Sequence, residues 1–203
     1  DLDIEKAGVT VERGFFKVDS KLRTSQKHIL AAGDCNGKFL FTHVAGSEGS
    51  VEVQRIALKI PAKMSYSNVP WCTYTDPELA SVGYNEQRAK EAGIDYRVIE
   101  ASFKDNDRAH AEGRVEGKVK ILADKKDRII GTQIAGLHAG ELLLPATYAV
   151  QKRMKVMDFR GPMFPYPVLG EIHKKALSNY LSPRLFNPKI KKILRFVFGY
   201  RGE

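Results

Sequence analysis

The sequence predicts a mixed α/β fold whose second part is an antiparallel sheet covered by helices on one side. Residues 96–103 alternate between apolar and polar side chains, and so do residues 114–123, as strands with one buried face do. Residues 124–127 read as a turn, after which residues 128–136 return as the partner strand of a hairpin. Apolar residues within 142–150 then follow a helical spacing. Helices packed on one face of such a sheet form a stable layer arrangement.

The part of the chain before this sheet carries shorter elements. Residues 8–19 read as a strand, a turn and a strand, and residues 28–32 as a short buried strand. A helix with an apolar face is expected over residues 46–58, followed by a linker that contains Pro, Ser and Asn. The expected division is a first domain over 1–60, the linker over 61–68, a second domain over 69–181 and a tail over 182–203.

Several residues mark expected helix boundaries in the second domain. Asn85 is a suitable N-cap and Gly93 a suitable stop for a short helix between them. Pro145 lies inside the next helical pattern and is expected to kink it. Pro167 suits the first turn of a last helix, which should end near Ser182.

Composition excludes several classes of protein. The chain has 203 residues, of which 43% are hydrophobic, enough to form a core. Cys35 and Cys72 are far apart, match no metal or redox spacing and suit a reducing cytoplasm, so neither a metal site nor a disulfide is expected. No apolar run is long enough to cross a membrane, and no signal peptide opens the sequence.

The positive charge is concentrated in the carboxyl-terminal segment. Residues 174–203 hold eight Lys or Arg and one acid, which gives +7 of the net charge of +9. An apolar face formed by Ile190, Ile193, Leu194 and Val197 lies beside Lys191, Lys192 and Arg195. Such a helix can dock on its own domain or dimer mate, lie on an anionic membrane surface, or contact nucleic acid. No nucleic-acid partner is expected, because no recognisable nucleic-acid module accompanies the charge.

The dipeptide Gly33-Asp34 follows the expected buried strand. Ligands bind at the carboxyl ends of strands in open α/β sheets, and Gly33 permits close approach of a ligand to the backbone. The Asp34 carboxylate suits a sugar-like hydroxyl group. The alternative is an ordinary loop aspartate.

Five segments keep the order and spacing of one known family. Residues 24–34 resemble the second flavin-binding motif of the FAD-dependent pyridine nucleotide-disulfide oxidoreductases, and residues 8–19 resemble the strand pair before it. Residues 41–46 resemble the start of the helix beneath the flavin ring, and residues 69–83 the opening of the dimerisation domain. Residues 166–171 stand where the family carries His-Pro-Thr and a later Glu.

The resemblance implies two cofactors, FAD and NAD(P)H. It implies that Asp34 binds the ribityl chain and that the helix beginning near His43 directs its backbone amides at the flavin, while the His43 side chain itself could simply pack. The residues so assigned to the flavin are Gly33, Asp34, Phe41, Thr42, His43 and Ala45. The Gly-rich FAD fingerprint, the redox cysteine pair and the nicotinamide domain of the family are not visible in this sequence.

Tyr166 and Glu171 are the candidate catalytic residues. In the disulfide reductases a His held by this Glu is an acid/base that acts on the redox disulfide of the other subunit. Tyrosine, which mercuric reductases and their relatives also carry here, is a poor base at neutral pH, because its pKa is ordinarily about 10. It can donate a hydrogen bond or, if ionised, bind a soft metal. The alternative is a packed aromatic residue between Pro165 and Pro167.

The other histidines and cysteines have no expected catalytic role. The side chains of His28, His110, His138 and His173 are expected at the surface or at helix caps, because they lack metal-ligand spacing. Cys35, directly after Asp34, is expected to be a small packed thiol, and the alternative is a reactive one.

The resemblance as a whole predicts the last part of an α/β, Rossmann-like FAD domain followed by an α+β dimerisation domain. The predicted function is a mercuric-reductase-like or dihydrolipoamide-dehydrogenase-like oxidoreductase, although the absence of His at position 166 argues against dihydrolipoamide dehydrogenase activity. The expected assembly is a cytoplasmic homodimer acting on a small disulfide or metal ion, with a peripheral membrane position through the tail left open. The chain alone is expected to be inactive. The alternative function is a stand-alone, non-catalytic dimerisation or adaptor module.

Overall fold

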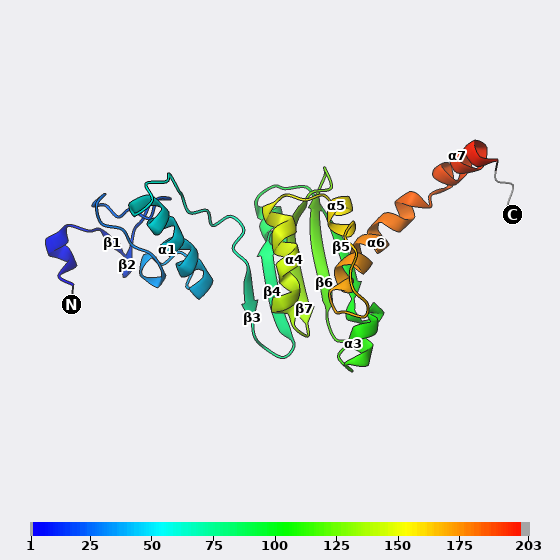
Figure 1. Cartoon of the computed structure of the whole chain (residues 1–203), viewed down its shortest axis with the longest axis horizontal. Helices are drawn as coiled ribbons and strands as arrows, with labels where there is room; N and C mark the ends of the chain where they lie inside the picture. Colours follow the sequence, from blue (N-terminus) through cyan, green and yellow to red (C-terminus); the bar gives the residue numbers. More distant parts are fainter. Residues whose placement is uncertain (1, 200–203) are drawn as a thin grey trace. The chain divides into compact units, whose positions relative to one another are not determined.

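A computed structural model describes residues 2–199 as two compact units divided between Ser67 and Asn68 (Figure 1). The first unit contains few strands and one long helix. Its elements are a 3-10 helix over Ile4–Ala7, β1 over Val11–Glu12, β2 over Phe15–Phe16, a 3-10 helix over Asp34–Asn36 and α1 over Thr42–Ile56. Strands β1 and β2 pair antiparallel, as the strand–turn–strand pattern predicts.

Two expectations for the first unit are corrected. Residues 28–32 are not a strand, and Leu30 forms a single antiparallel bridge to Arg23. A strand requires a neighbour along its length, and within the described residues of this unit only Arg23 pairs with this segment. Helix α1 begins at Thr42 rather than residue 46, because the Phe41 carbonyl already accepts from the amides of Val44 and Ala45.

The second unit is built on a five-stranded antiparallel sheet in the order β3-β4-β7-β6-β5. Its strands are β3 over Trp71–Thr73, β4 over Glu78–Gly83, β5 over Tyr96–Ser102, β6 over Lys118–Asp124 and β7 over Ile129–Gly136. The predicted hairpin is β6–β7, and its turn follows Asp124, within one residue of the expected position. Strand β6 begins at Lys118 rather than at residue 114.

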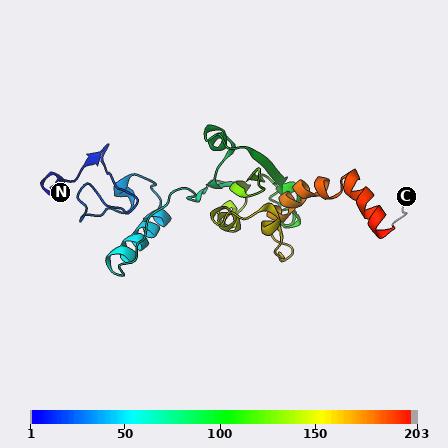
Figure 2. The ribbon, with the colours of Figure 1, turned by 90° about the horizontal axis from the view of Figure 1, so that it is seen from above.

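The register of the strands explains the core of the second unit. Ala80 pairs with Ile134, Ile134 with Val119, and Val119 with Ala101. All four side chains are buried, and paired residues share one face of a sheet. Helix α4 over Ala139–Gln151 packs on β4 and β7, and α6 over Glu171–Leu185 packs on β5 and β6 (Figures 1 and 2). The expected sheet with a helical layer is confirmed.

The remaining helices test the predicted boundaries. They are α2 over Glu86–Glu91, α3 over Asp107–Ala111, α5 over Val156–Arg160 and α7 over Pro188–Phe198. Asn85 caps α2 by accepting from the Arg88 amide at 2.8 Å, as predicted. Helix α6 begins at Glu171 rather than at Pro167. The residues just before it form a turn, in which the Glu171 amide donates to the Val168 carbonyl. It also continues beyond Ser182, through Pro183 to Leu185.

Candidate functional site

The Gly33-Asp34 loop of the first unit is held by one buried carboxylate. Glu48 of α1 is 1% exposed, and its Oε2 accepts from the Gly33 amide at 2.6 Å and from Asn36 Nδ2 at 2.9 Å. The Tyr66 hydroxyl donates to Glu48 Oε1. Burial first, and then this bond to Glu48, raises the pKa of Tyr66, which therefore remains a neutral donor.

The structure brings several of the predicted flavin residues together. A Cβ added to Gly33, whose φ is +81°, would lie 3.4 Å from the Cβ of Ala45, so the loop passes directly over α1. Asp34 is exposed, and Thr42 begins the first turn of α1. The Phe41 and His43 rings stack with centroids 5.2 Å apart. The Gly33 loop and the start of α1 therefore lie against each other.

Cys35 differs from its prediction because it is exposed rather than packed. It lies in the short 3-10 helix after Gly33, and its Sγ donates to the Ala32 carbonyl at 3.2 Å. Partial desolvation first, and then the negative charge of Glu48, raise the pKa of Cys35. The group is therefore a thiol at neutral pH and is not an activated nucleophile.

The second candidate region surrounds Tyr166. This side chain is 70% exposed, and its hydroxyl donates to Asp107 Oδ2 at 3.1 Å. The bond to Asp107 first, with the charge of Glu171 as a smaller cause, raises the pKa of Tyr166. The phenol therefore stays protonated at neutral pH and serves as a hydrogen-bond donor rather than as a base.

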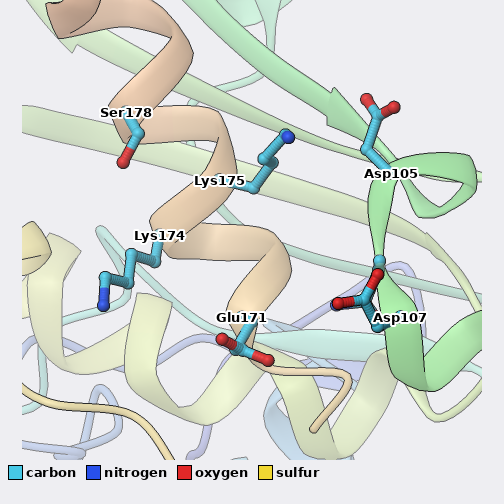
Figure 3. A pocket seen from close by; sticks show the side chains of 7 residues that line it. Asp105, Asp107, Glu171, Lys174, Lys175 and Ser178 are labelled. Atoms are coloured by element: carbon cyan, nitrogen blue, oxygen red, sulfur yellow. The ribbon is translucent and has the colours of Figure 1, made fainter. Parts of the chain in front are cut away.

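A pocket beside Tyr166 mixes carboxylates and amines. It is lined by Asp105, Asn106, Asp107, Glu171, Lys174, Lys175 and Ser178. Figure 3 shows Asp105 and Asp107 on one wall and the residues of α6 on the other. Asn106 holds the Asp105–Asp107 side of the pocket to the loop before α6. Its Nδ2 donates to the carbonyls of Val168 and Leu169 at 3.2 and 3.3 Å. Sequence reasoning missed Asp107, because no local pattern joins residues 59 positions apart.

His173 is also placed differently from its prediction. It is fully buried rather than at the surface, and its Nε2 lies 2.9 Å from the Leu142 carbonyl oxygen. Its Nδ1 has no hydrogen-bond partner among the described residues, and the Phe159 ring lies 5.4 Å away. Burial lowers the pKa of His173, although the bond to Leu142 partly opposes this. The ring is therefore neutral in the folded protein at pH 7.

This burial predicts a pH dependence of the stability of the second unit. The ordinary pKa of histidine is 6.5, and the folded value is lower, so below pH 6.5 the unfolded chain binds more protons. We expect the stability to fall as the pH drops below 6.5 towards the folded pKa, by at most about 1.4 kcal/mol per pH unit for one proton. Urea denaturation followed by the fluorescence of Trp71, the only tryptophan, measures this slope. His173→Gln, which can still donate to Leu142, should flatten it; an unchanged slope would assign the dependence to other groups.

Two family models match the chain. The dimerisation-domain model of the pyridine nucleotide-disulphide oxidoreductases matches residues 69–177, more than half of the chain. The chain belongs to the pyridine nucleotide-disulphide oxidoreductases. A second model described by the same family name matches residues 1–49, which include the Gly33-Asp34 loop. The family resemblance read from the sequence is confirmed, and members of this family depend on FAD and NAD(P).

Curated relatives of this oxidoreductase chain include dihydrolipoyl dehydrogenases. Dihydrolipoyl dehydrogenase 3 of Haloarcula marismortui is 36% identical over 180 residues, which cover 88% of this chain and 38% of the relative. The dihydrolipoyl dehydrogenase of Bacillus subtilis is 34% identical over 178 residues, 87% of this chain and 38% of the relative. The chain therefore spans less than half the length of these relatives, which do not single out the mercuric-reductase branch.

Solved oxidoreductase structures share the fold. LpdA from Mycobacterium tuberculosis matches with a TM-score of 0.82 and 29% identity, over 88% of this chain and 39% of that one. The flavoprotein disulfide reductase RclA from Escherichia coli, which is HOCl-induced, matches in its Cu(II) complex with a TM-score of 0.81 and 25% identity. That match covers 86% of this chain and 41% of the RclA chain.

Proposed function

We propose that this chain is the carboxyl-terminal part of a homodimeric FAD- and NAD(P)H-dependent oxidoreductase that reduces a small disulfide or a metal ion. The observation that carries the proposal is the Tyr166 hydroxyl, which donates to Asp107 beside Glu171 and the pocket at the start of α6. In the reductases that the sequence resembles, this position faces the redox disulfide of the other subunit. The protonated phenol has one O–H, which would turn from Asp107 to a developing thiolate when the acceptor is reduced.

The first unit offers residues that fit the flavin. Gly33 leaves open the space that a Cβ would fill above Ala45, and the exposed Asp34 carboxylate can accept from a ribityl hydroxyl group. The N-terminus of α1, which begins at Thr42, carries the partial positive charge of the helix dipole and favours negative charge. The bound flavin would carry the electrons from the nicotinamide to the acceptor. The chain's own residues bind and orient it.

The acceptor class follows from the chemistry of Tyr166. Reduction of a disulfide adds two electrons and yields two sulfur anions. A neutral hydrogen-bond donor stabilises such an anion, whereas a carboxylate would repel it. The mercuric-reductase-like tyrosine at this position and the Cu(II) complex of the structural neighbour RclA support a metal ion as the other acceptor. The phenol would donate its hydrogen bond to a reduced sulfur atom, whereas a metal ion would be bound by the phenol oxygen after loss of its proton. Asp107, which accepts from the hydroxyl, positions Tyr166 in both cases.

Removal of the Tyr166 hydroxyl tests this proposal. In the full-length protein that contains this chain, Tyr166→Phe should slow flavin reoxidation by the disulfide or metal-ion acceptor about ten- to a hundredfold, as expected for one lost hydrogen bond to a charged group. Flavin reduction by the nicotinamide should keep its rate. Stopped-flow absorbance of the flavin separates these two half-reactions.

Tyr74→Phe is the matched control, because Tyr74 is an exposed tyrosine that does not line the pocket. Its two half-reactions should match those of the wild type. Equal reoxidation rates in wild type and Tyr166→Phe would reduce Tyr166 to a surface aromatic residue and remove the proposal's main support. A protein that neither retains flavin nor oxidises a nicotinamide would instead favour the non-catalytic adaptor.

A further inference from the structure

Helix α7, over Pro188–Phe198, is a separate element with its own start signal. The Asn187 side chain accepts from the Ile190 amide at 3.0 Å and donates to the Arg184 carbonyl at 2.7 Å, and Pro188 occupies the first turn. A side-chain cap and an N-terminal proline both favour helix initiation at this point. Figure 1 draws α7 as the last helix of the chain. It lies beyond residue 177, where the match to the dimerisation-domain model ends.

The two sides of α7 differ in chemistry. Ile190, Ile193, Leu194 and Val197 follow the i, i+3, i+4, i+7 spacing of one helical face, as the sequence predicts. These side chains do not form a core: Val197 is 63% and the adjacent Phe198 75% exposed, and within the described residues of α7 none is buried. Large apolar side chains clustered on an exposed face indicate a surface that another phase or molecule covers.

The charged residues of α7 are all basic. Lys189, Lys191, Lys192 and Arg195 occupy the helix, and it contains no Asp or Glu. Among the ion pairs of the described residues, no carboxylate is paired with any of the three lysines. The positive charge of these three lysines is therefore available to an anionic partner.

We propose that α7 lies flat on an anionic lipid bilayer, with its apolar face below the headgroups and its lysines among the lipid phosphates. Low net hydrophobicity combined with opposed apolar and basic faces is the signature of an interfacial helix. Lysine stems can extend from the buried face to the headgroups. Within the described residues no helix is both long and apolar enough to cross a bilayer, so α7 would rest on the surface.

Charge complementarity favours a bilayer over the α7 helix of a second copy. A two-fold contact between two α7 helices would bring eight like charges together with no acid on either helix to compensate. An anionic lipid surface instead attracts each Lys or Arg. The proposal is independent of the oxidoreductase function, since it rests on none of the candidate site residues.

Vesicle co-sedimentation of the full-length protein that contains this chain tests the proposal. We expect binding to vesicles of phosphatidylcholine with phosphatidylglycerol, weak binding to phosphatidylcholine alone, and release by high salt. The double variant Lys191→Glu, Lys192→Glu should bind the anionic vesicles at least about tenfold more weakly. Lys125→Glu, Lys126→Glu is the matched control, because it makes the same change in net charge at two exposed lysines of the β6–β7 turn. The control should bind like wild type.

The apolar face has a separate variant. Ile193→Ser, Val197→Ser keeps every charge, and it should also weaken vesicle binding at least about tenfold, since two large apolar side chains no longer enter the lipid. Equal sedimentation with both vesicle types, equal loss in the control, or no sedimentation at all would overturn the proposal. So would a change of oligomeric state in the apolar variant without vesicles, which would assign the face to a protein contact. Tighter binding to duplex DNA than to anionic vesicles would assign the charge to nucleic acid.

Discussion

Gly117→Ala is expected to destabilise the second unit by about 2–6 kcal/mol. Gly117 has a φ of +101°, which side-chain-bearing residues rarely adopt, and an added Cβ would lie 2.0 Å from the Ala135 carbonyl oxygen. That oxygen belongs to the backbone of β7, so the chain before β6 would have to move off the sheet. The Gly117 carbonyl, which accepts from the Phe103 amide at 3.2 Å, would move with it.

A second glycine separates the two causes. Gly113 has a φ of +66°, but an added Cβ would meet nothing within 4 Å. Gly113→Ala therefore carries only the left-handed backbone cost, about 1–2 kcal/mol. Urea denaturation followed by Trp71 fluorescence measures both variants. Equal losses of stability in the two variants would mean that β7 shifts to accommodate the new side chain and that the contact with Ala135 does not destabilise the fold.

Replacing Glu48 by leucine is expected to release the Gly33-Asp34 loop, at a cost of about 2–5 kcal/mol. Leucine fills a similar volume but accepts no hydrogen bond, so the Gly33 amide, the buried Asn36 amide group and the Tyr66 hydroxyl all lose their acceptor. Hydrogen exchange of the amides in residues 33–36 reports the opening free energy of this loop directly.

Glu48→Gln is the matched control for the same site. Its single carbonyl oxygen can accept from the loop, while its amide group donates to the Tyr66 oxygen, which can also accept. We therefore expect amide exchange within about tenfold of wild type, equivalent to about 1.4 kcal/mol or less. Full protection in Glu48→Leu would show that the loop is held by packing alone. If the proposed flavin role of Asp34 is correct, the leucine variant of the full-length protein should also lose FAD.

Local pattern accounts for most of the second unit. Strands β5, β6 and β7 and the helix α4 follow from period-two and helical spacing, because each element has one face against the core. The N-cap at Asn85 and the β6–β7 turn could also be predicted, since caps and turns depend on neighbouring residues. The predictions that the helix starts at Pro167 and ends near Ser182 were wrong. Proline permits a helix start without requiring one, and α6 tolerates Pro183 in its last turn.

The expected strand over residues 28–32 failed for a different reason. Its apolar run is real, and Ala31 is buried, but a strand also requires a neighbour along its length. In the described part of the first unit the segment has only the bridge between Leu30 and Arg23. Apolar composition predicts burial, whereas pairing is a property of the whole sheet.

The sequence by itself determined the family, the kinds of element in the second unit, the candidate positions Asp34 and Tyr166, and the amphipathic pattern of α7. Only the tertiary structure decided which groups those residues meet. It placed Asp107 at the Tyr166 hydroxyl, Glu48 beneath Gly33, and His173 in the core with one unpartnered nitrogen. Periodicity records which face of an element is buried, because that face repeats along the chain. A hydrogen bond between distant residues occurs once and leaves no repeat, so it becomes visible only when folding brings its two groups within about 3 Å.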